Sequence, residues 1–223
     1  MGWPRRLVAV RHAESVGNTM QVDERATWHV ASHDYALTER GRAQAQITGE
    51  WLRANCEPFN THYVSYYTRA KETMKIMFPD AKVYEDPRLA EAQRGEYHTM
   101  THEEMVRKYP EELERKKREG LYHYRPRGGE NWPDIELRIH SFLGTLTRDC
   151  EDDTVVMVVH GHWLILLQRL IDRFTIDEAV RRYHGHVVEN ASVTIYEGVR
   201  KFNGKSRLQL VTQEPIVPWQ GKL

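Results

Sequence analysis

The sequence predicts an α/β protein: a three-layer sandwich with a mostly parallel central sheet and helices on both faces. Two short apolar runs, 7–10 and 154–159, are typical of strands that are buried on both faces of a parallel sheet. Between them, apolar residues recur at helical spacing in 43–51 and 135–146. Strands that alternate with helices in this way indicate a layered α/β domain.

Local signals suggest the elements that complete this architecture. The strand-like segment 63–65 leads into a helix with Arg69 at its start, and 82–84 is expected to form an edge strand. A capping box from Thr175 to Glu178 opens a late helix. The last expected elements are the strands 192–196 and 208–212, with Asn203-Gly204 as the turn signal between them.

The segment 99–129 differs in composition from the rest of the chain. It contains a capping box, Thr101 to Glu104, followed by a highly charged stretch at 111–119. Basic and acidic side chains alternate in that stretch, which favours a solvated helix face over a nucleic-acid surface. We therefore expect a single domain over 1–223 that carries a helical, cap-like insertion at about 99–129.

Composition and charge exclude several classes of protein. With 223 residues, 40% of them hydrophobic, the chain can bury a sizeable core. Its 32 basic and 32 acidic side chains balance, so neither nucleic acid nor an anionic membrane is expected as a partner. The longest apolar stretch, 163–167, is far too short to span a membrane. Nothing in the sequence indicates an oligomeric state.

Cysteine usage and the N-terminus favour a cytoplasmic protein. Cys56 and Cys150 are far apart and outside any paired-ligand spacing, which argues against a disulfide scaffold or a thiolate metal site. The apolar run at 7–10 is too short for the core of a signal peptide. A reducing cytoplasm therefore fits best.

Two histidines stand at the ends of the two predicted buried strands. Arg11-His12 follows the first strand and His160 follows the second. In open α/β sheets, ligands bind at the carboxyl ends of the strands, so these residues are expected to share a site. An isolated Arg-His pair would more often be a surface pair without a function. The second histidine at the same end of another strand favours a functional site.

Arg69 and Glu91 are the next candidates for that site. A guanidinium at a helix start can grip a phosphate with two hydrogen bonds, although an exposed Arg69 paired with Glu72 is the plainer alternative. Glu91 follows the expected edge strand, where a carboxyl group could act as a general acid, whereas most glutamates are simply solvated.

Taken together and in order, these motifs resemble the histidine phosphatase superfamily, also called the phosphoglycerate mutase-like fold. The resemblance spans nearly the whole chain, and alanine replaces the usual glycine of the Arg-His-Gly-Glu hallmark. It is carried by Arg11-His12-Ala13-Glu14, Asn18, Leu37-Thr38-x-x-Gly41, Gln44-Ala45, the segment 65–73, Glu91, the segment 126–131 and His160-Gly161.

The resemblance implies a role for each matching residue. His12 would be the residue that is phosphorylated during turnover, with Arg11, Arg69 and His160 around the transferred phosphoryl group. Asn18 would add a neutral hydrogen bond. Glu91 would donate a proton to the leaving oxygen. Fixed positive donors suit this chemistry because the transferred group spreads its charge over its equatorial oxygens.

No cofactor or metal is expected. The pairs His160-x-His162 and His184-x-His186, and the helical spacing of His98 and His102, have the look of metal ligands. No cluster of carboxylates or thiolates accompanies them, however, and the resemblance assigns His160 to phosphate. Whether His162, His184 or His186 contributes to the site is left open by the sequence.

The substrate is expected to be a small phosphorylated metabolite, and hydrolysis is the expected reaction. After Glu91 the chain lacks the arginine-tyrosine-glycine element of the cofactor-dependent phosphoglycerate mutases, which remain the first alternative. A non-catalytic module that binds phosphorylated ligands is the second, and the complete catalytic set argues against it. The expected substrate contacts are Arg94, Tyr97, His98 and Arg125, with Trp28 and His123 as further candidates and Arg127 as a possible partner for a second anionic group.

Overall fold

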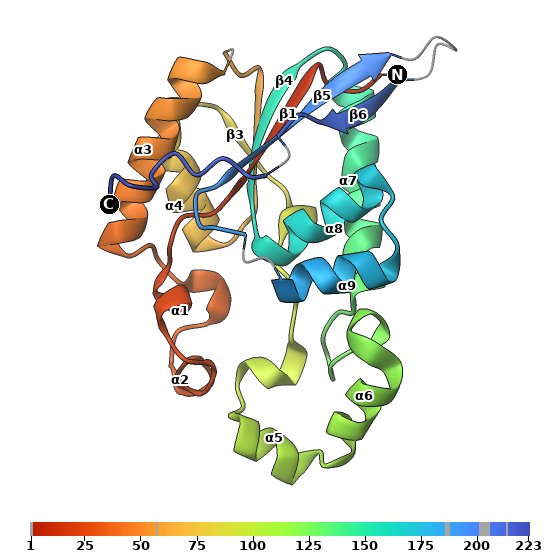
Figure 1. Ribbon diagram of the computed structural model, residues 1–223. Coiled ribbons are helices and arrows are strands. Elements are labelled where there is room, and N and C mark those ends of the chain that lie inside the picture. Colours follow the sequence, from red (N-terminus) through yellow and green to blue (C-terminus); the bar gives the residue numbers. More distant parts are fainter. Residues whose placement is uncertain (1, 57, 186–187, 201–205, 213) are drawn as a thin grey trace.

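A computed structural model describes residues 2–56, 58–185, 188–200, 206–212 and 214–223 of the chain (Figure 1). Its centre is a six-stranded sheet in the order β3-β2-β4-β1-β5-β6. The strands are β1 (Arg6–Arg11), β2 (Thr61–Val64), β3 (Val83–Glu85), β4 (Thr154–Val159), β5 (Val193–Arg200) and β6 (Ser206–Leu210). The first four strands pair in parallel, whereas β5 runs antiparallel to both β1 and β6.

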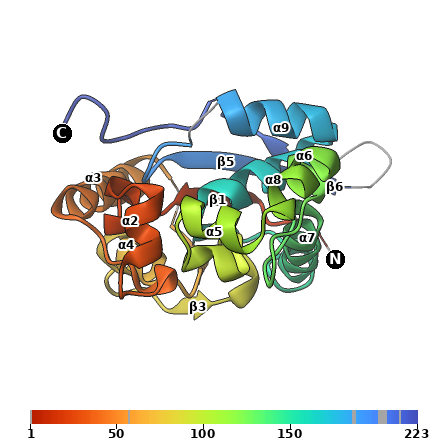
Figure 2. The same ribbon diagram turned by 90° about the horizontal axis from the view of Figure 1, so that it is seen from below.

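Helices cover both faces of the sheet, and shorter ones lie beyond its carboxyl edge (Figures 1 and 2). The α-helices are α1 (Val16–Thr19), α2 (Val22–Thr27), α3 (Glu39–Asn55), α4 (Thr68–Met77), α5 (His102–Lys108), α6 (Glu111–His123), α7 (Trp132–Asp149), α8 (Gly161–Asp172) and α9 (Ile176–Gly185). Three short 3-10 helices are η1 (Ser32–Asp34), η2 (Pro87–Leu89) and η3 (Gly95–His98). No helix within these described ranges is long and apolar enough to cross a membrane.

The alternation of side chains along the strands divides the core into two layers. Leu7 and Ala9 of β1 join one apolar cluster, with α7 and α8, whereas Val8 and Val10 join the other, with α3 and α4. All six residues of β4 are buried, as its β-branched and mostly apolar sequence predicts. The predicted three-layer α/β sandwich is therefore confirmed.

The topology brings the ends of three buried strands to one edge. β1, β4 and β2 are parallel neighbours, so Arg11, Val159 and Val64 all finish there. The helices α1 and α2 follow β1, and α5 and α6 occupy the predicted insertion beyond the same edge (Figure 1). Polar residues that follow these strands are consequently collected into one region.

The element boundaries agree with the sequence with small shifts. The edge strand expected at 82–84 is β3 (Val83–Glu85), and the two C-terminal strands are β5 and β6. The expected strand at 208–212 lies two residues earlier, at Ser206–Leu210. The turn signal at Asn203-Gly204 lies outside the described residues.

The Leu-Thr-x-x-Gly element fixes the start of α3 against the segment after His12. Thr38 is the N-cap, and its Oγ1 accepts a hydrogen bond from the Gly41 backbone nitrogen at 2.9 Å. A Cβ atom on Gly41 would lie 2.0 Å from the carbonyl oxygen of Glu14. Glycine is therefore required for this close approach, which holds the loop that follows β1 in place.

Candidate active site

His12 comes directly after β1 and is only 3% exposed. Its Nδ1 lies 2.8 Å from the carbonyl oxygen of Ala13, so this nitrogen carries the proton and donates it. The other ring nitrogen, Nε2, accepts a hydrogen bond from Nε of Arg69 at 3.1 Å. His12 therefore holds an unprotonated Nε2, which is the form of imidazole that can attack an electrophile.

The surroundings of His12 keep its ring neutral. Burial is the largest cause, followed by the positive charges of Arg69 and Arg11, and together they lower the pKa of His12 well below its usual value. The lone pair on Nε2 is consequently available at neutral pH without a separate base to remove a proton.

Arg69 lies in the first turn of α4 and is held on several sides. Beyond its bond to His12, Nη1 donates to the carbonyl oxygen of Ser32 at 2.8 Å and Nη2 lies 3.2 Å from Nδ1 of His160. Its guanidinium also lies over the ring of Tyr67, 4.4 Å from the centroid. The alternative pairing of Arg69 with Glu72 is absent, because Glu72 accepts from the backbone nitrogen of Leu37 at 2.7 Å instead.

His160 lies behind Arg69 and is fully buried. Because its Nδ1 accepts from Arg69, its Nε2 carries the proton and donates to Oγ of Ser65 at 2.7 Å. Burial and the charge of Arg69 are the largest causes that lower its pKa well below the usual value, so the ring is neutral. Both ring nitrogens have protein partners, and His160 therefore supports Arg69 rather than lining the cavity described below.

Arg11, the last residue of β1, offers a donor that has no acceptor. Its Nη1 donates to the carbonyl oxygen of Val188, whereas its buried Nε has no hydrogen-bond partner among the described residues. Arg11 lines the same cavity as His12, and its charge acts on the pKa of that histidine, so its guanidinium is placed to bind an anionic ligand there.

Glu91 provides the carboxyl group of the site and lies beside His162. Its Oε1 accepts from the backbone nitrogen of Ala92 at 3.0 Å and is 3.7 Å from Nδ1 of His162. Burial alone would raise the pKa of Glu91, but the hydrogen bond and charge of His162 and the hydrogen bond from the Ala92 backbone lower it well below its usual value. In the absence of a ligand the carboxyl group is therefore ionised.

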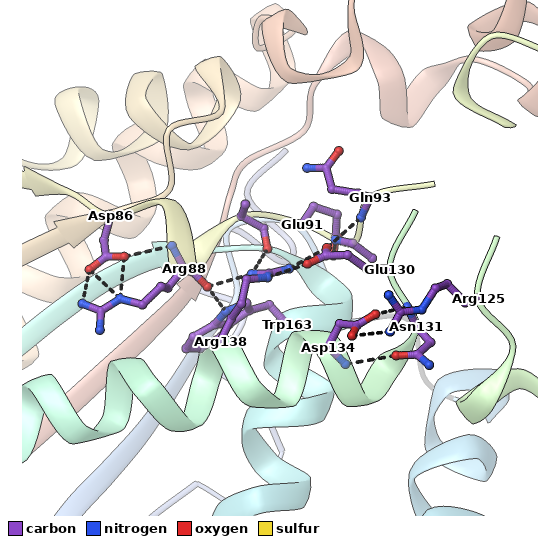
Figure 3. A network of polar contacts seen from close by, with 12 residues as sticks. Asp86, Arg88, Glu91, Gln93, Arg125, Glu130, Asn131, Asp134, Arg138 and Trp163 are labelled. Carbon is purple, nitrogen blue, oxygen red and sulfur yellow. Dashed lines mark hydrogen bonds and ion pairs between the residues drawn. The ribbon is translucent and has the colours of Figure 1, made fainter. Parts of the chain in front are cut away.

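A network of polar contacts anchors the segment that carries Glu91 to α7 (Figure 3). Arg138 makes a two-pronged contact with Glu130, at 2.8 and 2.9 Å. Its Nη1 also donates to the carbonyl oxygens of Arg88 and Ala90, at 2.8 and 3.1 Å. These contacts fix the backbone immediately before Glu91.

Replacing Arg138 should therefore reduce both stability and activity. We expect Arg138→Met to lower the free energy of unfolding by about 2 kcal/mol, because charge-assisted hydrogen bonds are lost and Glu130 is left half-buried without its partner. Turnover should fall about tenfold as Glu91 loses its fixed position. Denaturant titration and steady-state assays check both values, with Arg148→Gln on the exposed side of α7 as the control. Unchanged stability and turnover in Arg138→Met would contradict this role.

A cavity of about 220 Å³ opens at this edge of the sheet. His12, Arg11, Arg69 and Glu91 line it, together with four of the expected substrate contacts. These four are Asn18, Arg94, Tyr97 and His98. The structure thus brings these residues together at one cavity, whereas His160 lies one layer deeper and Arg125 lies elsewhere.

Arg125 lies elsewhere, so its expected contact with substrate is not supported by the structure. Its Nη2 pairs with Oδ1 of Asp134 at 2.5 Å, and its side chain is 55% exposed (Figure 3). Asp134 lies in the first turn of α7 and attracts the cation to the helix start. Trp28 and His123 are also absent from the cavity lining: Trp28 packs on Tyr35, with ring centroids 5.1 Å apart.

Several residues that shape the site were not singled out by the sequence. Arg25 lines the cavity from α2, and Ser32 links Arg69 to His98, whose Nε2 lies 3.5 Å from Ser32 Oγ. His162, left open by the sequence, also lines the cavity. No local signal marks Arg25 or Ser32, because they reach the cavity through loop packing.

The histidine pairs do not form a metal site within the described residues. There, no three His, Cys, Asp or Glu side chains come together in a group that could hold a metal ion. His160 and His162 turn to different partners, Ser65 and Glu91. His184 is exposed on α9, and His186 lies outside the described residues.

Comparison with known proteins agrees with this geometry. The family described as the histidine phosphatase superfamily (branch 1) matches residues 7–209. A protein of Gloeobacter violaceus named 2,3-bisphosphoglycerate-dependent phosphoglycerate mutase 2 is 34% identical over 176 residues, which cover 76% of each chain.

Solved structures share the fold. The α-ribazole phosphatase of Shigella flexneri matches with a TM-score of 0.71 and 20% identity, over 92% of this chain and 95% of the other. YhfR of Bacillus stearothermophilus matches with a TM-score of 0.74 and 25% identity, over 96% of this chain and 98% of the other. The chain therefore belongs to branch 1 of the histidine phosphatase superfamily.

Proposed function

We propose that the protein is a phosphomonoesterase that hydrolyses a small phosphorylated metabolite through a phosphohistidine intermediate on His12. The observation that carries this proposal is the neutral His12, whose unprotonated Nε2 accepts from Nε of Arg69 and which lines the same cavity as Arg11. A neutral nucleophile in a cavity with two guanidinium groups suits attack on a phosphoryl group.

The first chemical step transfers the phosphoryl group to the protein. Nε2 of His12 attacks phosphorus and forms a P–N bond while the bond from phosphorus to the ester oxygen breaks. Arg69 and Arg11 donate to the phosphoryl oxygens, and Arg69 exchanges His12 for an oxygen as its acceptor. Glu91, protonated because the incoming dianion opposes its ionisation, gives its proton to the leaving oxygen.

The second step returns the phosphoryl group to water. Glu91, now ionised, takes a proton from a water molecule whose oxygen attacks phosphorus. The P–N bond breaks, inorganic phosphate forms, and His12 regains its lone pair. Glu91 keeps 21% of its side-chain surface exposed, so water can reach it. This access supports hydrolysis as the fate of the intermediate.

Phosphoglycerate mutase activity is the second candidate, because a 34% identical relative carries that name. A mutase must keep water away while a bisphosphorylated intermediate turns round, which demands a closed site. The access of water to the partly buried Glu91 and the missing mutase element after it favour hydrolysis. The complete set of His12, Arg69 and Glu91 argues against a non-catalytic binding module.

Four further features belong to the same proposal. We propose that α5 and α6 act as a cap over the cavity within a single domain. Arginines supply the positive charge that a metal would otherwise provide, so no metal or other cofactor is required. The protein is placed in the cytoplasm, and its partner is the phosphorylated substrate rather than nucleic acid or membrane.

A panel of phosphorylated metabolites, with released phosphate as the readout, tests this function. The purified protein should release phosphate from at least one ester at an unchanged rate in excess chelator. Interconversion of phosphoglycerates, measured on the same preparation, should be slower than that hydrolysis. Interconversion that outpaces hydrolysis of every ester would establish the mutase instead. Activity lost to chelator and restored by zinc or manganese would contradict the metal-free mechanism.

The lowered pKa of His12 predicts how the nucleophile and the fold respond to acid. The His12 ring should stay neutral, with its proton on Nδ1, as the pH falls from 8 to 6.5 and somewhat below. Because the unfolded chain takes up this proton near pH 6.5 and the folded chain resists it, stability should decrease as the pH falls below 6.5. Nitrogen NMR of the ring, assigned by its loss in His12→Ala, reads the protonation state. A ring that is half protonated at pH 6.5 would refute the description of His12 as a buried neutral nucleophile.

A further inference from the structure

A second group of positive charges lines the same cavity. Arg25 comes from α2, and Arg94 is the residue immediately before η3. Nε of Arg69 lies 3.1 Å from Nε2 of His12, whereas burial and the charge of Arg94 lower the pKa of Arg25. Arg25 and Arg94 therefore form a second positive group in the cavity that holds Arg11 and Arg69.

Arg25 and Arg94 have almost no partners within the protein. Arg25 donates to the carbonyl oxygen of Gly17 at 3.2 Å, and it forms no ion pair with any described residue. The Arg94 guanidinium makes neither a hydrogen bond nor an ion pair within the described part of the chain. By contrast, Arg127 stacks on Tyr109, 4.5 Å from the ring centroid. It is therefore not free to bind the second anionic group of a substrate, for which the sequence suggested it.

The charges that line the cavity do not balance. Arg11, Arg25, Arg69 and Arg94 face one carboxylate, Glu91. A phosphate monoester brings close to two negative charges at neutral pH, which match the pair of arginines at His12. Arg25, which is partly buried, and Arg94, which is exposed, then remain at the cavity without a negative partner.

His98 does not add to or offset this charge. Burial is the main cause, followed by the charges of Arg94, Arg69 and Arg25, and together they lower the pKa of His98 to about 4. A neutral ring can still hydrogen-bond to an anion. The same effect indicates that the three arginines lie close enough to act on one side chain.

The two walls that carry these arginines are fastened to each other. α2 packs against η3, and the backbone nitrogen of His102 donates to Oδ1 of Asp23 at 3.0 Å. Figure 2 shows α2 and α5 in front of the carboxyl edge of the strands. Arg25 and Arg94 are thus held on neighbouring segments beyond the nucleophile.

We propose that Arg25 and Arg94 form a subsite for a second anionic group, so that the substrate is a phosphate monoester that also carries a carboxylate or a second phosphate. This inference rests on the proposed phosphatase function and narrows its substrate class. Arginine suits this task because its planar fork can bind either group with two hydrogen bonds.

Two pairs of probes that differ in one anionic group test the subsite. One pair is 3-phosphoglycerate and glycerol 3-phosphate, which reports on a carboxylate. The other is fructose 1,6-bisphosphate and fructose 6-phosphate, which reports on a second phosphate. Arg94→Gln and Arg25→Gln should each lower kcat/KM about tenfold for the probe with two anionic groups in at least one pair, mainly through KM. The matching probe with one anionic group should change less than about twofold.

Three further measurements make this result specific. Arg94→Lys keeps the charge and should recover part of the loss, whereas Arg118→Gln, on an exposed arginine of α6, should leave both ratios unchanged. Calorimetric binding of the same probes to His12→Ala should show tighter binding of the probe with two anionic groups. That readout does not need turnover, so it separates the subsite from the proposed reaction.

Each outcome distinguishes one claim from the other. If the protein hydrolyses no probe but binds the probe with two anionic groups more tightly, the proposed reaction is contradicted and the subsite is supported. The subsite would be contradicted if the Arg25 and Arg94 variants lost kcat/KM equally on both members of each pair. It would also be contradicted if neither kcat/KM nor the dissociation constants favoured the probe with two anionic groups.

Discussion

His12→Ala should abolish turnover while the fold persists. We expect kcat to fall by at least about 10⁴-fold, because the residue that forms the covalent bond is removed. The fold should remain because His12 lies at the end of β1, outside the two apolar clusters of the core. Phosphate release gives the activity, and circular dichroism with thermal unfolding gives the state of the fold.

A matched variant separates loss of the nucleophile from general damage. His140→Ala removes an exposed histidine of α7 and should keep the activity of the unaltered protein. Near-normal turnover in folded His12→Ala would rule out the covalent mechanism. If His12→Ala does not fold, His12→Asn, which keeps a polar side chain, would be assayed in its place.

Arg69→Gln should produce the second largest loss. Arg69 is a preorganised donor at the nucleophile, and removal of one such donor to developing charge costs about 10²–10³-fold in kcat. Nε of Arg69 is already 3.1 Å from the attacking nitrogen, so little rearrangement is needed when phosphate arrives. Steady-state kinetics should show the loss mainly in kcat, because the interaction strengthens as the transition state forms.

Arg69→Lys and Arg118→Gln complete this experiment. Lysine keeps the charge but cannot contact Ser32 and His160 together, so Arg69→Lys should fall between the unaltered protein and Arg69→Gln. Arg118→Gln removes an exposed charge on α6 and should retain full activity. A loss in Arg69→Gln no larger than that in Arg118→Gln would show that Arg69 does not stabilise the transferred group.

Residues at strand ends could be predicted from the sequence, because the chain itself reveals where they lie. His12 and His160 each follow a continuous apolar run, and the carboxyl ends of parallel strands meet at one edge. Arg69 comes shortly after β2, which pairs in parallel with β4, so it was expected at the same edge. The periodicity of the sequence and the parallel topology were enough to predict these positions.

Contacts made by loops could not be predicted in this way. Ser65 supports His160 across 95 positions of sequence, and Arg25 reaches the cavity only because α2 packs on η3. Arg125 was expected at the site because of its charge and its neighbouring motif. Its actual neighbour, Asp134, is set by the packing of α7, which no local pattern reveals.

The position of His160 illustrates a finer limit. Its place at the end of β4 was predictable, but the layer in which it lies depends on which partners occupy its two ring nitrogens. Arg69 and Ser65 take both, and they come from different elements. The sequence therefore identified the residue, whereas its role as a support for Arg69 required the structure.

Direct detection of the phosphorylated protein tests the central claim. The protein would be mixed with a phosphate ester that it hydrolyses, denatured in alkali within milliseconds, and digested for mass spectrometry. The account predicts one phosphoryl group per chain at most, stable to base, labile to acid, and located on His12. A phosphoryl group on any other residue, or steady-state turnover with no trapped phosphoprotein at any time point, would contradict it.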